Sequence, residues 1–80
     1  MIRYRIKELI ADKAFQEGRR ITLEEGSKST SIHRTTLSKI ANQKGYNTTT
    51  EVLDKLCAYF NVDLGQLAEH IKGQEDNENV

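Results

Sequence analysis

Apolar residues recur at steps of three and four along most of the chain, a spacing that places them on one face of an α-helix. In the first part of the chain this pattern predicts a helix from about Arg3 to Gln16, with Gly18 ending it. The apolar residues that carry this spacing are Ile2, Ile6, Leu9, Ile10 and Ala14. The opposite face carries most of the charged residues of the segment, as expected for a helix on the surface of a small domain.

A second helical pattern begins at Thr22-Leu23-Glu24-Glu25, which has the T-x-x-E form of a capping box. In such a box the Thr hydroxyl and the Glu carboxylate each satisfy a backbone N–H at the start of the helix. The box predicts a helix from about Leu23 to Ser29. Gly26 lies inside it and costs roughly 1 kcal/mol relative to Ala, so we expect a weak point there unless tertiary packing compensates.

A third pattern follows after only a few polar residues and predicts a helix from His33 or Arg34 to Asn42. Its inward residues are Ile32, Leu37 and Ile40. Its outer face is polar, mostly small and positively charged. Two short helices joined by such a turn, the second with this face, indicate a helix-turn-helix that suits a DNA groove.

The second half of the chain predicts two more helices. Thr48-Thr49-Thr50-Glu51 offers another T-x-x-E box, and Asp63-Leu64-Gly65-Gln66 is a D-x-x-Q variant of the same capping pattern. The inward residues are Val52, Leu53, Leu56, Cys57 and Phe60 in the fourth helix, and Leu67, Ala68 and Ile71 in the fifth. Residues 73–80 are polar and acidic, so we expect a disordered tail after one all-α domain over residues 1–72. No alternating pattern predicts a strand.

Charge changes the picture more than composition does. The chain holds 12 basic and 12 acidic residues, a balance that would ordinarily argue against a nucleic-acid partner. Residues 1–44, however, hold ten Lys and Arg against five Asp and Glu, for a net charge of +5, and residues 45–80 hold two against seven, for −5. The positive half contains the predicted helix-turn-helix. Arg3, Arg5, Arg19 and Arg20 either extend this positive surface or only keep a helix face soluble.

Several classes of function find no support in the sequence. Eighty residues give one small domain with no room for a ligand-binding domain, so we expect no small-molecule substrate and no cofactor. Cys57 is the only cysteine, which excludes an intrachain disulfide and suits the cytoplasm. No apolar run is long enough for a membrane span, and no signal peptide is evident. His33 and His70 lack a second ligand at a characteristic metal spacing, and no catalytic motif is present, so we expect neither a metal site nor an enzyme.

From Ile2 to about Ile71 the chain resembles the Cro/repressor-type (XRE-like) helix-turn-helix domains. The resemblance rests on four segments: Thr22-Leu23-Glu24-Glu25, Ile32 to Ile40, Asn42 with Lys44, and Leu53 to Cys57. It implies a compact, five-helix, lambda-repressor-like fold in which the second helix crosses the DNA backbone and the third, about residues 33–42, lies in the major groove. Four residues depart from the usual pattern: Gly26 and Ser27, where a large aliphatic residue and Ala are common, Ser31, where a turn glycine is common, and His33, a poorer helix cap than Ser or Thr.

The same resemblance implies which residues touch DNA. Two sets follow, those that read bases (Arg34, Thr35, Thr36, Ser38 and Lys39) and those that contact phosphates (Leu23 or its backbone, His33, Asn42, Lys44, Tyr46 and Asn47). Arg34 can donate two hydrogen bonds to a guanine, and the threonine methyls can meet thymine. The alternatives are a merely solvated helix face for the first set, and helix capping by Asn42 with a mobile Lys44 for the second.

These residues predict a sequence-specific, double-stranded DNA-binding transcriptional regulator, with repression as the favoured role. Because one short helix covers only a few base pairs, we expect a homodimer on a palindromic operator, with half-sites roughly 34 Å apart. The expected dimer surface is the fifth helix with part of the fourth, where basic charge is absent. Two alternatives stay open: an antitoxin that autoregulates its operon and neutralises a toxin partner, and a protein-interaction adaptor that has lost DNA binding.

Overall fold

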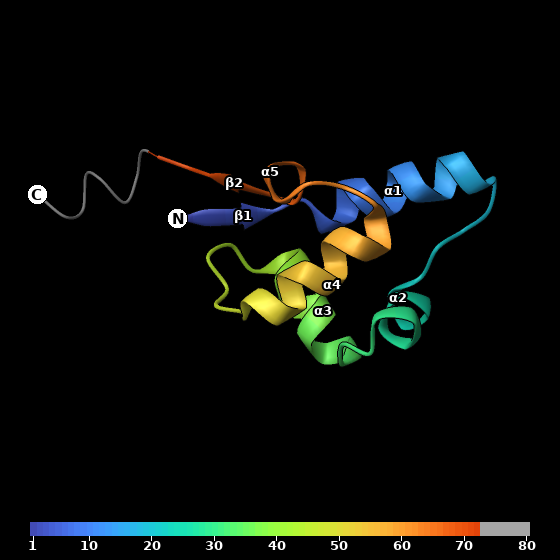
Figure 1. The fold of residues 1–80 in the computed structure, drawn as a ribbon, viewed down its shortest axis with the longest axis horizontal. Coiled ribbons are helices and arrows are strands. Elements are labelled where there is room, and N and C mark those ends of the chain that lie inside the picture. Colours follow the sequence, from blue (N-terminus) through green and yellow to red (C-terminus); the bar gives the residue numbers. More distant parts are fainter. Residues whose placement is uncertain (73–80) are drawn as a thin grey trace, which may run out of the picture.

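Five helices and one short pair of strands make up residues 1–72, the part of the chain that the computed structural model describes (Figure 1). The predicted acidic tail over residues 73–80 lies outside the described residues. In chain order the elements are β1 (Ile2–Tyr4), α1 (Ile6–Glu17), α2 (Leu23–Thr30), α3 (Arg34–Asn42), α4 (Thr50–Phe60), α5 (Leu64–Leu67) and β2 (Ala68–His70). The prediction of an all-α, five-helix domain is confirmed, with the strand pair as a minor addition.

The two ends of the described chain meet in that strand pair, which the sequence analysis missed. β1 runs antiparallel to β2, with Arg3 opposite Glu69. The pairing continues on either side, where the Arg5 amide donates to the Leu67 carbonyl at 2.8 Å and the Ile71 amide donates to the Met1 carbonyl at 2.8 Å. The first helix therefore begins at residue 6 rather than residue 3, and the last ends at residue 67 before Ala68 and Ile71.

The physical reason for both errors is the same. Ile2 and Ile6 are four residues apart and so imitate one turn of a helix, but Ile2 remains 38% exposed in the strand, whereas Ile6 is buried. A three-residue strand is too short to show an alternating pattern, and the residues it pairs with are 64 to 68 positions away in the sequence. Local spacing cannot detect such a pairing.

Helix α4 begins one residue later than the predicted capping box implied. The Thr49 hydroxyl, not that of Thr48, accepts the hydrogen bond from the Val52 amide at 3.2 Å. Three consecutive threonines offer three alternative caps, and the cap used is the one that leaves Leu56 buried in the core. The other helix limits agree with the prediction to within a residue, and Gly18 ends α1 with φ +66°.

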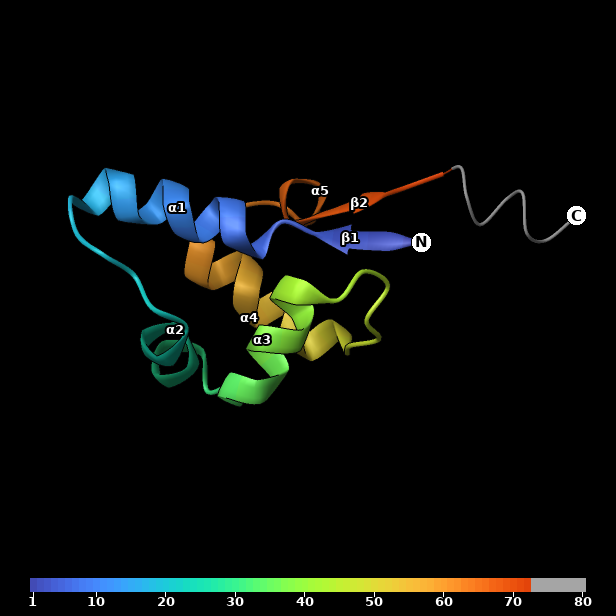
Figure 2. The ribbon, with the colours of Figure 1, turned by 180° about the vertical axis from the view of Figure 1, so that it is seen from behind.

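The core is a single cluster of nearly or fully buried side chains from α1, α3, α4, α5 and the turn before α3, and Leu23 of α2 packs against it. Its members are Ile6, Ile32, Leu37, Ile40, Leu56 and Leu67. In both views α1 and the strand pair lie on one side of α4, and α2 with α3 lies on the other (Figure 1 and Figure 2). Helices α2 and α3 pack against each other, α1 contacts both α3 and α4, and α4 also contacts α2. The outer face of α3 is left uncovered by this arrangement.

Among the described residues, 1–72, none of the helices could serve as a membrane span.

Candidate nucleic-acid interface

The turn between α2 and α3 is fixed by hydrogen bonds at its buried side. The Thr30 hydroxyl donates to the Gly26 carbonyl at 2.7 Å and accepts from the Ile32 amide at 3.2 Å. The Ser27 hydroxyl donates to the Ile32 carbonyl at 2.6 Å. Ser31 has φ +62°, the left-handed conformation expected at the position where a glycine is common. These bonds set the angle at which α3 leaves α2.

Gly26 lies where α2 meets α3 and α4. A β-carbon at this position would lie 3.7 Å from Cδ1 of Leu37 and 3.8 Å from the ring of Tyr59, which is ordinary van der Waals contact. A small apolar cavity of about 10 Å³ adjoins it. Close packing therefore does not require a glycine at this position. The destabilisation predicted for α2 is the helix-propensity cost of a residue that lacks the methyl group of Ala.

At the start of α2 only the Thr half of the predicted capping box forms, because the Glu25 carboxylate bonds Arg19 rather than the Thr22 amide. The Thr22 hydroxyl accepts from the Glu25 amide at 3.1 Å. Within the described residues the Leu23 amide has no hydrogen-bond partner, as is usual in the first turn of a helix. Free amides at a helix N-terminus favour an anion such as a phosphate.

His33 caps the third helix, despite its rank below Ser and Thr as a capping residue. Its Nδ1 accepts from the Thr35 amide at 3.2 Å. With Nδ1 as the acceptor, the hydrogen of the neutral imidazole is on Nε2. The side chain is exposed, so this second nitrogen remains available as a donor to a group outside the protein.

Four of the five predicted base-reading residues come together on the outer face of α3. Arg34, Thr35, Ser38 and Lys39 line one open hollow of about 360 Å³ together with Leu23 from the start of α2. Thr36 does not line it and is half-buried, because a step of two residues turns it towards the side of Ile40. We call the four residues in the hollow the reading face.

The other four residues predicted to contact phosphates lie at the end of α3 and in the loop after it. The side-chain Nδ2 of Asn42 donates to the Ser38 carbonyl at 2.8 Å, so in the free protein this side chain is bonded to its own helix. Lys44 and Asn47 are exposed, whereas Tyr46 is half-buried and packs against the core. The loop is held to β1 by the Gly45 amide, which donates to the Ile2 carbonyl at 2.8 Å.

The basic side chains of the described chain fall into two groups. Five form ion pairs: Arg3, Arg5, Lys13, Arg19 and Lys55. Seven have no ion pair with any described residue: Lys7, Arg20, Lys28, Arg34, Lys39, Lys44 and Lys72. Of the four arginines whose role the sequence left open, only Arg20 belongs to the second group. The others are balanced by acids within the domain.

The pairs in the first group are true charge partners. Arg19 bonds Glu25 in a two-pronged contact of 2.9 and 2.5 Å, and these hydrogen bonds hold the pKa of Glu25 below its ordinary value. Arg3 bonds both Glu8 and Glu69, and its contact with Glu69 is 2.7 Å. These arginines have little charge left to offer a ligand.

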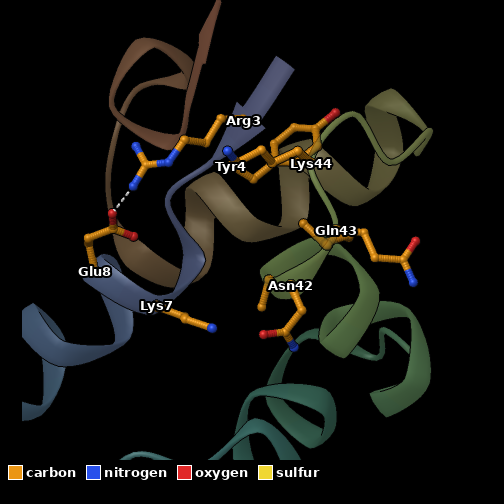
Figure 3. Close-up of a pocket in the computed structure, with 9 residues that line it drawn as sticks. Arg3, Tyr4, Lys7, Glu8, Asn42, Gln43 and Lys44 are labelled. Carbon is orange, nitrogen blue, oxygen red and sulfur yellow. Dashed lines mark hydrogen bonds and ion pairs between the residues drawn. The ribbon is translucent and has the colours of Figure 1, made fainter. Parts of the chain in front are cut away.

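Two further hollows continue from the reading face towards α1. The first is lined by Arg34 and Leu23 and also by Lys7, Arg20 and Asn42. The second, shown in Figure 3, contains Lys7 and Asn42 again, together with Lys44 and the Arg3–Glu8 pair. In Figure 3 Lys7 extends from α1 towards α3, on the side where Asn42 lies. Lys7 could not be singled out from the sequence. Apolar spacing marks the buried face of α1, but it does not show which exposed face of α1 lies beside α3.

Comparison with known proteins identifies one family. The model for Cro/C1-type HTH DNA-binding domains matches residues 5–73, which is most of the chain. No curated protein and no solved structure matches.

Proposed function

The chain belongs to the Cro/C1-type helix-turn-helix DNA-binding family, and from this premise we propose that it is a transcriptional repressor that binds a palindromic operator as a homodimer. The observation that carries the proposal is the reading face. Arg34, Thr35, Ser38 and Lys39 line a single hollow on the uncovered side of α3, and neither basic residue among them is neutralised within the described chain. An exposed helix with these side chains fits the major groove.

Base recognition follows from the chemistry of these side chains. Arg34 donates two hydrogen bonds to O6 and N7 of a guanine, and Thr35 offers a methyl group to thymine or a hydroxyl to a base edge. Ser38 and Lys39, one turn further along α3, read the next base pairs. Thr36, at the margin of the helix face, is a neighbour of these contacts.

Docking on the backbone uses groups on both sides of the reading face. The Leu23 amide at the start of α2 and Nε2 of His33 donate to phosphates at one end of α3. Asn42, Lys44, Tyr46 and Asn47 do so at the other end. For Asn42 this requires that the amide turn away from Ser38 when DNA binds, since its nitrogen is engaged there in the free protein.

The homodimer supplies the specificity that one nine-residue helix lacks. Two copies place two recognition helices in half-sites about 34 Å apart, one turn of DNA. We place the dimer contact on α5 and the adjoining part of α4, where Leu64 is 55% exposed and the nearby charges are acidic.

Selection of bound sequences from a random duplex pool tests the proposal. A palindromic consensus with half-sites one helical turn apart supports a dimeric DNA reader, and a consensus without symmetry contradicts the dimer. Binding to duplex DNA with no dependence on salt, or no binding at all, would instead favour the adaptor. Measurement of expression from a promoter carrying the selected site distinguishes repression from activation.

A further inference from the structure

A second basic surface lies beside the reading face, on α1 and the connection that follows it. Lys7 and Arg20 line an open hollow of about 470 Å³ whose other lining residues include Arg34 and Asn42 from α3. No acidic residue among residues 1–72 lines this hollow. Both cations are exposed, and neither forms an ion pair with a described residue.

The hollow is continuous with the surfaces on either side of it. It shares Leu23 and Arg34 with the hollow of the reading face. It shares Lys7 and Asn42 with the hollow that contains Lys44. The one acid in that neighbouring hollow, Glu8, is bonded to Arg3. A band of unneutralised positive charge therefore runs from α3 across the start of α2 to α1.

The basic side chains of this band differ from most of those elsewhere in the described domain, which are paired with acids. On the side of the strand pair, Arg3 and Arg5 are both engaged by Glu69, and beyond α1 Arg19 is engaged by Glu25. Arg19 and Arg20 are adjacent in sequence, yet within the part of the chain that the structure describes only Arg19 has an acidic partner. The cations that remain without partners beside α3 are those placed to meet an anion from outside.

We propose that Lys7 and Arg20 form a second phosphate-binding site for the DNA backbone, outside the helix-turn-helix. This inference rests on the proposed function and extends its footprint to α1. Its ligand is the phosphodiester backbone, and its contacts carry no sequence information. The site anchors the strand that passes the start of α2, and it holds α3 at a fixed angle in the groove.

The test is the salt dependence of binding to a mixed-sequence duplex, measured by fluorescence anisotropy between about 50 and 200 mM salt. The Lys7→Ala/Arg20→Ala variant should have a slope of log K against log salt that is less steep by about two, since each phosphate contact contributes about 0.9. Its affinity loss relative to the parent should then be about tenfold greater at the low end of this range than at the high end.

The matched control is Lys28→Ala/Lys72→Ala, which removes two cations that, like Lys7 and Arg20, form no ion pair with a described residue but line none of these hollows. It should keep the parental slope. An equal reduction of slope in the control would show a general charge effect and overturn the site, as would an unchanged slope in the Lys7→Ala/Arg20→Ala variant. Lys7→Arg/Arg20→Lys should retain the slope, and circular dichroism melts confirm that each variant is folded.

Failure of this inference is separable from failure of the proposed function. If the parent binds duplex DNA with a steep salt slope and the Lys7→Ala/Arg20→Ala variant keeps that slope, the α1 site is wrong and DNA binding stands. If the parent shows no salt-dependent binding, both are wrong.

Discussion

Nδ1 of His33 lies 3.2 Å from the backbone nitrogen of Thr35 and accepts the hydrogen bond of that amide. The N-cap of α3 is thus an imidazole rather than a hydroxyl. Replacement of a Ser, Thr, Asn or Asp N-cap by Ala typically costs about 1 kcal/mol of stability, and His is a weaker cap, so His33→Ala should lower the free energy of unfolding by no more than that amount. His33→Ser should restore it, because a hydroxyl accepts the same bond. Urea denaturation of the three proteins measures the difference, and equal stabilities would mean that the cap contributes nothing.

Gly26→Ala should stabilise the protein. The added methyl meets Leu37 and Tyr59 at ordinary contact distances, beside an apolar cavity of about 10 Å³, and Ala in a helix is favoured over Gly by up to about 1 kcal/mol. Gly18→Ala is the control with the opposite sign, because Gly18 has φ +66° and an Ala there is strained. Thermal melts should therefore move up for the first variant and down for the second. A lower melting temperature for Gly26→Ala would show that α2 and α4 cannot accept the methyl group.

The helices could be predicted from the sequence because their information is local. The Thr22 hydroxyl and the Glu25 amide that it caps are three residues apart, and Leu37 and Ile40 repeat within one turn. The strand pair could not, since Arg3 and Glu69 meet only when the whole chain has folded. The choice of Thr49 over Thr48 as a cap is of the same kind, because the core decides between equivalent neighbours.

The candidate site divides in a similar way. Arg34, Ser38 and their neighbours share a face because of helical periodicity, which a sequence contains. Which basic residues are free is a property of the tertiary structure. Arg19 and Arg20 look alike in the sequence, and only the fold brings Glu25 to the first and leaves the second beside α3.

Arg34→Ala tests the base-reading assignment. If Arg34 binds a guanine through O6 and N7, its loss should cost about 1 to 3 kcal/mol on the preferred duplex and relax the preference at that single base pair. Lys44→Ala is the contrast, because loss of a phosphate contact should weaken all duplexes alike and reduce the salt slope by about one. Affinities for a set of duplexes with single base-pair changes measure both effects. An unchanged preference in Arg34→Ala would remove this residue from the reading face.

Acid should weaken the contact between Arg19 and Glu25. Hydrogen bonds from Arg19 hold the pKa of Glu25 below its ordinary value of 4.5, so the pair stabilises the folded state above about that pH. The contribution is lost as the pH falls through the lowered pKa. Glu25→Gln should accordingly be less stable than the parent at pH 7, and the gap should close towards pH 3. Glu24→Gln, in the same turn of α2 but without an ion pair among the described residues, should show a smaller gap at pH 7. Urea midpoints at the two pH values decide the matter.

Leu64 should govern self-association. It begins α5 with 55% of its surface exposed, beside the end of α4 that we assign to the dimer contact. A charge buried there without a partner opposes association, so Leu64→Glu should shift sedimentation towards the monomer and weaken binding to a two-half-site duplex far more than to one half-site. Phe15→Glu is the matched control, because Phe15 is 88% exposed and lies on a different helix, near the end of α1. If Phe15→Glu separates the subunits and Leu64→Glu does not, the dimer forms through α1 instead. A parent that binds the palindrome as a single copy would contradict both surfaces.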